Sequence, residues 1–503
     1  MMHINPIYWR YAGTAINFQL EMNFYNRSTN RKEIAYVDYH QKHGRLGDAA
    51  NVDQGQFGVP AFVVRCDDAQ NIPPNASRRA NRRKIIMKQT LTIPETFLGV
   101  GYTKDRGGLP LEAVRVPVPR PRADQVLIRV AASSFNPLEY KLADLNFFGR
   151  TPPVILGLDL SGIVVATGSA VRGVAVGDAV VAMADLNGNG GWVAEGGGEG
   201  GYALAREFLT VPKPESLSFL SAAALPMCFL SAFAGLYGTV QAGDTVYIPG
   251  GGGGVGHLAV QMAARVLGAG LVISSGSTLQ STALARQSGA HYVFDYKLAD
   301  IAAEILKLTG GRGADLVFDA TYSEPGFVGT AKTVRQGGSW IVLGVGPGKT
   351  TRVVETLSPV DSILAERGAR HVNVNLLRYF SEPATLDDEA KAFLQRGLAL
   401  AMEWAVQGLV VPHVVRTIDS TVEAINAGLR SLKPGTGTLG KVAVIVDRDL
   451  VEGKRLTIGA VDGVAGFRRL VADSPSGGRE FSDSIDGKIG QARKHRAQIV
   501  ANW

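Results

Sequence analysis

The clearest chemical signal in the sequence is a run of five glycines, Gly250 to Gly254, followed by Gly256. The run lies between an apolar, β-prone stretch, Thr245–Ile248, and a helix-like apolar pattern. Glycines at 251, 253 and 256 fit the G-x-G-x-x-G turn that binds a dinucleotide pyrophosphate between a strand and a helix. Their missing Cβ atoms allow, in order, a tight turn, close approach of the phosphates and close helix–strand packing. A flexible glycine loop is the alternative.

The end of the next predicted strand bears on which dinucleotide binds. It reads I-S-S-G-S, Ile273–Ser277, where NAD-binding sites typically carry an Asp or Glu that holds the ribose 2′-hydroxyl. Without that carboxylate the main repulsion against a 2′-phosphate is absent, and serine hydroxyls can donate to it. The sequence therefore favours NADP(H) over NAD(H). The predicted cofactor-binding residues of these two segments are Gly251, Gly253, Gly254, Val255, Gly256, Ser274, Ser275 and Ser277.

Strands and helices alternate after the glycine run, which predicts an α/β fold with a Rossmann-type, doubly wound parallel sheet. A cofactor on such a sheet lies at the carboxyl ends of the strands. The stretch L-G-V-G-P-G from Leu343 follows a predicted strand, so Gly344 and Val345 are expected near the nicotinamide. The predicted strands are Leu271–Ser275, His291–Phe294, Ala314–Asp319 and Trp340–Gly344, and the predicted helices are Gln280–Ser288, Ile301–Thr309 and Gly326–Arg335.

The net charge of the 503-residue chain is concentrated at its ends. The formal charge is +7 and the sequence pI is about 9.2, but residues 1–86 carry +5, residues 87–449 carry −1 and residues 450–503 carry +3. Basic tails can bind nucleic acid, yet a nearly neutral centre makes nucleic acid an unlikely partner of the central region. The tails are expected to be poorly ordered extensions, and translation starting at Met87 is a further possibility.

Other features limit the cellular setting. Two cysteines, Cys66 and Cys228, cannot form a disulfide framework and fit a reducing compartment, so the cytoplasm is expected. No apolar run reaches 18 residues, and the first thirty residues lack the pattern of a signal peptide, so no membrane association is expected.

Residues 87–449 resemble the medium-chain dehydrogenase/reductase superfamily, specifically its zinc-independent, quinone oxidoreductase-like branch. The resemblance implies a GroES-like, partly β-barrel catalytic domain, formed by residues 87–220 and 376–449, around a Rossmann domain of residues 221–375. The active site would lie in the cleft between these domains. The stretches that carry the resemblance are Asp124–Leu142, Gly157–Gly168, Gly177–Val181, Ala222–Pro226, the glycine run and Gly440–Val446.

The resemblance also indicates which positions would hold the ligands of a catalytic zinc ion. Catalytic zinc needs three Cys, His or carboxylate ligands, and the positions that match the first two ligands of zinc-dependent members hold Asn136 and Leu158. Cys228 lies near the third position but cannot hold the ion alone, and is expected to be a small buried hydrophobe. The sequence therefore predicts no metal. Asp159, beside Leu158, is expected to have a structural role at a domain junction more than an acid–base role.

Without zinc, hydrogen bonds must polarise the substrate carbonyl or conjugated double bond. Asn136 resembles the Asn of the Asn-Pro element that lies near the nicotinamide, although a turn-forming Asn before a proline is the alternative. Tyr140 could donate a phenolic proton, or could simply pack in the core. Ser231 resembles a position that often holds a Thr near the nicotinamide, although a helix-interior Ser is equally expected. Enoyl-thioester reductases of the superfamily carry a catalytic Tyr shortly after the Asn-Pro element, but the stretch Leu145–Gly149 has Phe147 and Phe148 there, which argues against that chemistry.

These features predict an NAD(P)H-dependent, zinc-independent oxidoreductase that transfers hydride to a quinone, an enone or a similar carbonyl electrophile. An alcohol dehydrogenase-like carbonyl reductase is the alternative among enzymes. A non-catalytic NADP(H)-binding sensor or scaffold is the alternative outside enzymes, since a fold does not fix a function. The expected partner is a small-molecule substrate, and the resemblance suggests a homodimer.

Overall fold

The structure of the protein is a computed structural model, and the chain divides into two compact units, residues 1–84 and 85–503. The structure describes residues 3–12, 15–26, 31–42, 90–91, 93–146, 148–185, 188–195, 200–321, 324–343, 358–374, 376, 386–432, 439–453 and 457–458.

The first unit contains one antiparallel sheet of three strands in the order β1-β2-β3. These strands are His3–Ala12, Ala15–Asn26 and Arg31–Lys42, and neighbouring strands pair in the antiparallel sense. They belong to the part of the sequence, 1–86, that we expect to be a poorly ordered extension. Most of the C-terminal extension, 450–503, lies outside the described residues.

The second unit contains a six-stranded parallel sheet in the order β14-β13-β12-β15-β16-β17. The chain order runs outward from β12 in both directions, which is the doubly wound arrangement that the alternating pattern predicts. The predicted fold class is therefore confirmed. The strands are β12 Thr245–Pro249, β13 Leu271–Gly276, β14 Tyr292–Asp295, β15 Ala314–Asp319, β16 Val334–Leu343 and β17 Arg370–Val374.

The helices between these strands are α4 Gly256–Arg265, α5 Leu279–Ser288, α6 Ile301–Leu308, α7 Glu324–Ala331 and α8 Ser358–Glu366. Most predicted boundaries agree to within one or two residues. The predicted helix Gly326–Arg335 is wrong at its end, because Arg335 already lies in β16. The apolar, helix-like spacing continues past Ala331, but Thr333 accepts from the backbone N–H of Ala314, which starts the pairing with β15.

A second six-stranded sheet has the order β11-β10-β9-β7-β19-β18, and β11 also pairs with β7. This extra pairing closes part of the sheet into a barrel, beside a smaller sheet in the order β6-β5-β8. The strands are β5 Thr96–Tyr102, β6 Glu112–Pro117, β7 Gln125–Ser134, β8 Val154–Ile155, β9 Asp159–Thr167, β10 Ala179–Ala184, β11 Gly201–Pro212, β18 Val414–Asp419 and β19 Lys441–Ile445.

Strands from far apart in the sequence therefore share the second sheet, since β18 and β19 follow the whole parallel sheet along the chain. The split domain 87–220 and 376–449 remains our prediction. Two short strands, β4 Thr90–Leu91 and β20 Thr457–Ile458, pair in parallel beside it.

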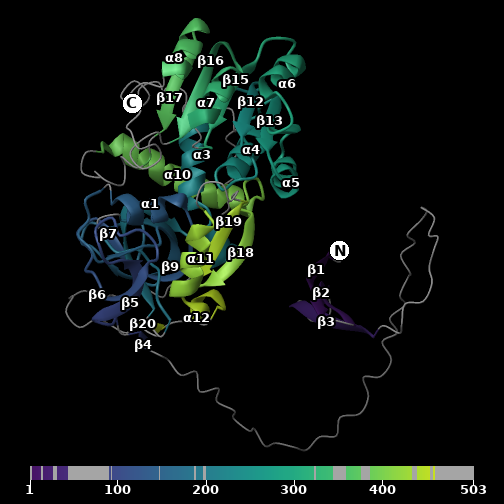
Figure 1. Cartoon of the computed structure of the whole chain (residues 1–503). Coiled ribbons are helices and arrows are strands. Elements are labelled where there is room, and N and C mark those ends of the chain that lie inside the picture. The colour runs from purple at the N-terminus through teal and green to yellow at the C-terminus, as the bar shows by residue number, and fades with distance from the viewer. Residues whose placement is uncertain are drawn as a thin grey trace, which may run out of the picture. The chain divides into compact units, whose positions relative to one another are not determined.

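Helices α3 and α10 lie between the two six-stranded sheets (Figure 1), and α3 contacts strands of both. The aromatic rings of Phe229 and Phe233 on α3 pack against Trp404 on α10, with centroids 5.6 and 6.4 Å apart. Every helix within the described ranges is too short or too polar to span a bilayer. The helices of this part are α1 Pro137–Leu145, α2 Phe219–Ala223, α3 Pro226–Leu236, α10 Asp388–Val406, α11 Val422–Arg430 and α12 Arg448–Val451.

Candidate active site

The glycine run forms the tight turn between β12 and α4. Gly250 has a φ of +68°, a conformation that favours glycine. A Cβ on Gly251 would lie 2.1 Å from Ser274 Oγ, and a Cβ on Gly256 would lie 2.1 Å from the carbonyl oxygen of Gly250. Neither distance is possible for real atoms, so the turn can close only with glycine at both positions. These are the turn and packing roles that the sequence predicts.

The same turn leaves donors free at the start of α4. Among the described residues, the backbone N–H groups of Gly254 and Val255 have no protein acceptor. Free N–H groups at a helix N-terminus, with the positive end of the helix dipole, form a favourable site for phosphate. Gly252 lets the turn pack closely against α5, since a Cβ on it would lie 2.5 Å from Ser281 O. The residues present therefore fit a dinucleotide pyrophosphate.

The three serines at the end of β13 and just after it have different surroundings. Ser274 is completely buried, donates to the carbonyl of Ile248 and accepts from the N–H of Gly251, so it supports the turn. Ser275 is also buried, and its hydroxyl bonds to the hydroxyl of Tyr247 at 3.0 Å. Only Ser277 of the three predicted serines is partly exposed. 

The Ser277 hydroxyl accepts a 3.0 Å hydrogen bond from the hydroxyl of Tyr296, which is half exposed. The two hydroxyls lie where β13 and β14 end, the edge at which the ribose of a dinucleotide is expected.

A second polar group forms where three strands of the other sheet end together. The end of β7 pairs antiparallel with the start of β9, Ser134 opposite Asp159, and with the start of β19, Ser134 opposite Ala443. In the same register Lys441 comes opposite Asn136, which caps α1 and is followed by Pro137 at the first helical position. Strand register therefore brings together residues from three distant parts of the chain.

Asn136, Asp159 and Lys441 form the centre of this group, which we call the amide–ammonium cluster together with Glu139 and Cys228. The amide Nδ2 of Asn136 donates to Asp159 Oδ2 at 2.9 Å, and Lys441 Nζ donates to Asn136 Oδ1 at 2.8 Å. Lys441 Nζ also donates to the carbonyl of Phe135 at 2.8 Å and lies 3.4 Å from Asp159 Oδ2. These bonds fix which way the Asn136 amide faces.

The remaining carboxylate contacts come from backbone N–H groups and from one serine hydroxyl. Asp159 Oδ1 accepts from the N–H of Met227 on α3, and Glu139 accepts from the N–H groups of Asn136 and Leu158. Ser134 also donates to Asp159, at 3.0 Å.

The amide–ammonium cluster lies directly against the glycine turn. A Cβ on Gly254 would lie 3.3 Å from Cys228 Sγ and 3.6 Å from Lys441 Cδ. The backbone N–H of Gly440 donates to the carbonyl of Gly252 at 2.9 Å. The two predicted halves of the site, the phosphate turn and the Asn136 element, are therefore adjacent.

Burial and charge shift the pKa values of this cluster. Burial alone lowers the pKa of Lys441, but the acidic groups of Cys228, Asp159 and Glu139 outweigh it and raise the pKa above its ordinary value. Burial raises the pKa of the Cys228 thiol. Burial, and next the charge of Asp159, raise the pKa of Glu139 to about 8, although Lys441 opposes the shift. The cluster thus keeps a buried cation at neutral pH.

The raised pKa of Glu139 predicts a specific pH dependence of stability. Between about pH 5 and 8 the folded chain holds a proton that the unfolded chain has lost, so stability should fall as pH rises, by up to ~1.4 kcal/mol per pH unit. Glu139→Gln should remove this slope. Urea unfolding across this range checks it, and parallel curves for the two proteins would contradict the assignment.

The other two predicted catalytic residues have different surroundings. Ser231 is buried in α3 and its hydroxyl donates to the carbonyl of Met227 at 2.8 Å, within its own helix. Tyr140 is 6% exposed within the large hydrophobic cluster, and burial raises the pKa of its hydroxyl. Their catalytic roles remain predictions. Gly344 and Val345 lie outside the described residues.

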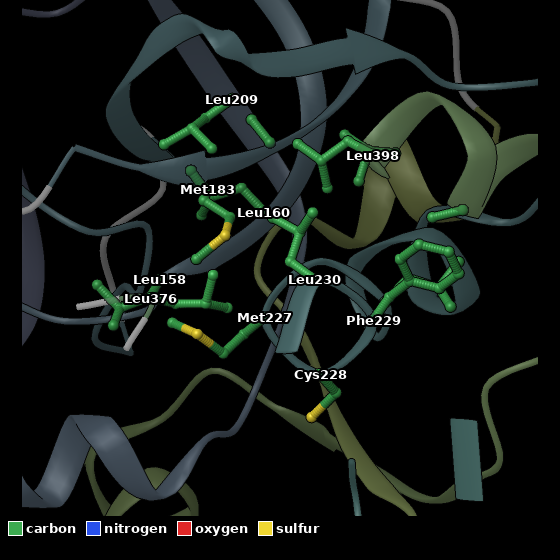
Figure 2. Packing of buried hydrophobic residues seen from close by; sticks show 14 of the residues in the cluster. Leu158, Leu160, Met183, Leu209, Met227, Cys228, Phe229, Leu230, Leu376 and Leu398 are labelled. Carbon is green, nitrogen blue, oxygen red and sulfur yellow. The ribbon is translucent and has the colours of Figure 1, made fainter. Parts of the chain in front are cut away.

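The residues at the expected metal position do not fit a catalytic zinc. Leu158 is buried in the hydrophobic cluster, and Figure 2 shows it among apolar side chains that include Met227 and Leu376. Asn136 is held by Asp159 and Lys441. Within the part of the chain that the structure describes, no three His, Cys, Asp or Glu side chains are grouped so that they could hold a metal ion.

Sequence reasoning missed Lys441 and Glu139, and it treated Asp159 and Cys228 as structural. Lys441 could have been found from its position as a lysine at the start of an otherwise apolar strand, G-K-V-A-V-I-V. A charge at a buried position needs a partner of opposite charge or a hydrogen bond. The signal for Glu139 is its position three residues after Asn136, the spacing of a capping box. Tyr296 was also missed, because it contacts Ser277 across two separate loops and the sequence alone does not show which loops meet.

Two family models match the chain, one over the Asn136 element and one from the glycine turn onward. Residues 122–217 match the family model described as "Alcohol dehydrogenase GroES-like domain", and residues 254–385 match the one described as "Zinc-binding dehydrogenase". The first range contains Asn136 and Asp159, and the second begins in the glycine turn.

Several similar proteins are reductases or oxidoreductases by name. The chain is 32% identical over 304 residues to 2-methylene-furan-3-one reductase of Solanum lycopersicum, covering 58% of this chain and 73% of the relative. It is 32% identical to the chloroplastic NADPH-dependent alkenal/one oxidoreductase of Arabidopsis thaliana, covering 54% and 68%. It is also 32% identical to the quinone oxidoreductase of Rattus norvegicus, covering 46% and 67%.

A solved structure matches most of the chain. An alcohol dehydrogenase superfamily protein from Novosphingobium aromaticivorans aligns with a TM-score of 0.59 and 26% identity, over 70% of this chain and all of that one.

Proposed function

The chain belongs to the quinone oxidoreductase-like branch of the medium-chain dehydrogenase/reductase superfamily, and from this premise we propose that it reduces quinones or enones with a nicotinamide cofactor. One observation carries the proposal: the amide–ammonium cluster lies against the turn that fits the pyrophosphate, with Lys441 Cδ 3.6 Å from where a Cβ of Gly254 would be. The relatives whose names specify reduction of furanones, alkenals and quinones support the substrate class.

The cluster can stabilise the negative charge that develops on a substrate oxygen. The cofactor, when bound, supplies the hydride. The Asn136 amide has a second N–H besides the one given to Asp159, and we assign it to the substrate oxygen. Lys441 holds the other end of this amide and adds a fixed positive charge in a buried setting, where such a charge acts strongly. Asp159 orients both groups.

We propose that this chemistry proceeds without zinc, because Asn136 and Leu158 stand where the first two ligands are expected and neither suits the ion. We also retain the cytoplasm and a homodimer as proposals. The low cysteine content and the resemblance support them, and size-exclusion chromatography with light scattering would test the dimer.

We propose NADPH as the preferred cofactor. The strand end Ile273–Ser277 has no carboxylate, Ser277 and Tyr296 place two hydroxyls at this edge, and one relative is NADPH-dependent by name. Ser277→Asp should raise the KM for NADPH by about 10- to 100-fold, since a carboxylate would repel the 2′-phosphate, and should leave the KM for NADH equal or lower.

The matched control for this change is Tyr296→Phe, which removes one hydroxyl without adding charge and should raise the KM for NADPH only about threefold. Both KM values come from initial rates of nucleotide oxidation. A Ser277→Asp protein with the wild-type preference would place the ribose elsewhere.

The activity itself is tested by following the absorbance of NADPH and NADH against a panel of quinones, enones and simple aldehydes. Turnover of quinones or enones is expected. Turnover of simple aldehydes alone would favour the carbonyl reductase, and tight nucleotide binding without turnover of any substrate would favour the sensor.

A further inference from the structure

His257, the second residue of α4, has both ring nitrogens engaged. Its Nδ1 lies 2.8 Å from the carbonyl oxygen of Gly253 in the glycine turn. The backbone N–H of His413 donates to its Nε2 at 3.0 Å. Since Nε2 accepts, the proton is on Nδ1, which donates to Gly253. The ring is completely buried, and burial lowers its pKa to about 4, in agreement with a neutral imidazole.

The two partners of this ring belong to different sheets of the protein. Gly253 is in the turn that follows β12 of the parallel sheet, whereas His413 immediately precedes β18 of the second sheet. The carbonyl of His413 in turn accepts from the backbone N–H of Lys441 at 2.8 Å. Hydrogen bonds thus run without a break from the phosphate turn, through His257 and His413, to Lys441.

The same face of α4 carries a second contact that offers a comparison. Gln261, one turn after His257, makes two bonds to the backbone of Val411, from its Nε2 at 2.9 Å and to its Oε1 at 2.8 Å. It therefore joins the same two parts of the chain as His257 does. Gln261 makes no bond to the glycine turn among the described residues.

We propose that His257 is a positioning residue that sets the glycine turn and the Lys441 strand in register with each other, so that the bound nucleotide meets the amide–ammonium cluster correctly. The proposal rests on the proposed function for the identity of the nucleotide. His257 itself reaches neither the substrate nor the cluster, and it acts through Gly253 on one side and through His413 on the other.

Two substitutions separate the two bonds of the ring. His257→Asn keeps a donor near the Nδ1 position and loses the bond to His413, whereas His257→Gln keeps an acceptor near the Nε2 position and loses the bond to Gly253. We expect His257→Asn to lower kcat about threefold to tenfold with NADPH binding nearly unchanged. We expect His257→Gln to weaken NADPH binding by a similar factor.

Nucleotide affinity is measured by NADPH fluorescence without substrate, and kcat with a quinone or enone that the wild-type protein reduces. Gln261→Leu is the control, and it should lower the thermal midpoint while leaving affinity and kcat nearly unchanged. Equal effects of all three variants on affinity and kcat would overturn the inference and leave His257 a structural residue. A wild-type protein that binds neither NADPH nor NADH would overturn the proposed function as well.

Discussion

Gly256→Ala is expected to abolish measurable NADPH binding. The new Cβ would lie 2.1 Å from the carbonyl oxygen of Gly250 and 2.9 Å from the Cα of Gly251, and both neighbours are backbone atoms that cannot rotate away. The turn must open to accept the methyl group, and the free N–H groups of Gly254 and Val255 then lose their common direction. We expect affinity to fall by about 100-fold or more, measured by NADPH fluorescence.

Gly329→Ala is the matched control for this experiment. Gly329 lies in α7 with open space around its Cβ position and without the left-handed φ that favours glycine. Its replacement should leave NADPH affinity unchanged and raise stability by about 0.5–1 kcal/mol, because alanine loses less backbone entropy in a helix. A Gly256→Ala protein that binds NADPH as tightly as Gly329→Ala would show that the pyrophosphate is not held at this turn.

Lys441→Met is expected to lower the free energy of unfolding by about 3–5 kcal/mol and to reduce kcat strongly. The side chains of Lys441 and Asp159 are 2% and 0% exposed, so removal of the cation leaves a buried carboxylate without its ion-pair partner. The Asn136 amide also loses the bond to its oxygen that fixes its direction. Urea unfolding followed by fluorescence gives the first quantity, and steady-state kinetics with NADPH gives the second.

Two further variants make this result interpretable. Lys441→Met combined with Asp159→Asn should recover much of the stability, because the uncompensated charge is gone, but not the kcat. Lys391→Met, which breaks an exposed pair with Asp388, should cost less than about 1 kcal/mol. A single Lys441→Met variant as stable and active as Lys391→Met would remove the ammonium from the proposed mechanism.

Local rules predicted the individual strands of the parallel sheet and the glycine turn well, because a strand or a turn depends mainly on neighbouring residues. The glycine run between Thr245 and Val255 specifies strand, turn and helix within twenty residues, and the predicted strand Ala314–Asp319 agrees at both ends. Where a helical and a strand pattern compete, the predicted end of the helix was wrong. The spacing around Arg335 suits a helix, and pairing with β15 made it a strand instead.

The amide–ammonium cluster could be predicted only in part, because its contacts are not local. Asn136 was identified from its resemblance to the Asn-Pro element of the family. Its partnership with Lys441 depends on the register of β7 against β19, which no sequence spacing gives. Ser274 shows a different limit of sequence-based prediction. It lies at the strand end as predicted, but its hydroxyl bonds to Gly251 and Ile248 and so completes the glycine turn. These contacts can be seen only in the structure.

The pairing of β7 with β19 has a consequence for how the enzyme is made. Asn136 and Lys441 are 305 residues apart in the chain, and the whole nucleotide sheet is synthesised between them. Contacts at such sequence separation form late, since a long loop must first be closed. A nascent chain that has passed β17 already holds every strand of the parallel sheet, yet it still lacks the ammonium of the amide–ammonium cluster. Lys441 is therefore among the last parts of the two sheets to leave the ribosome, so a chain interrupted before β19 cannot carry out the proposed reduction even with its phosphate turn complete.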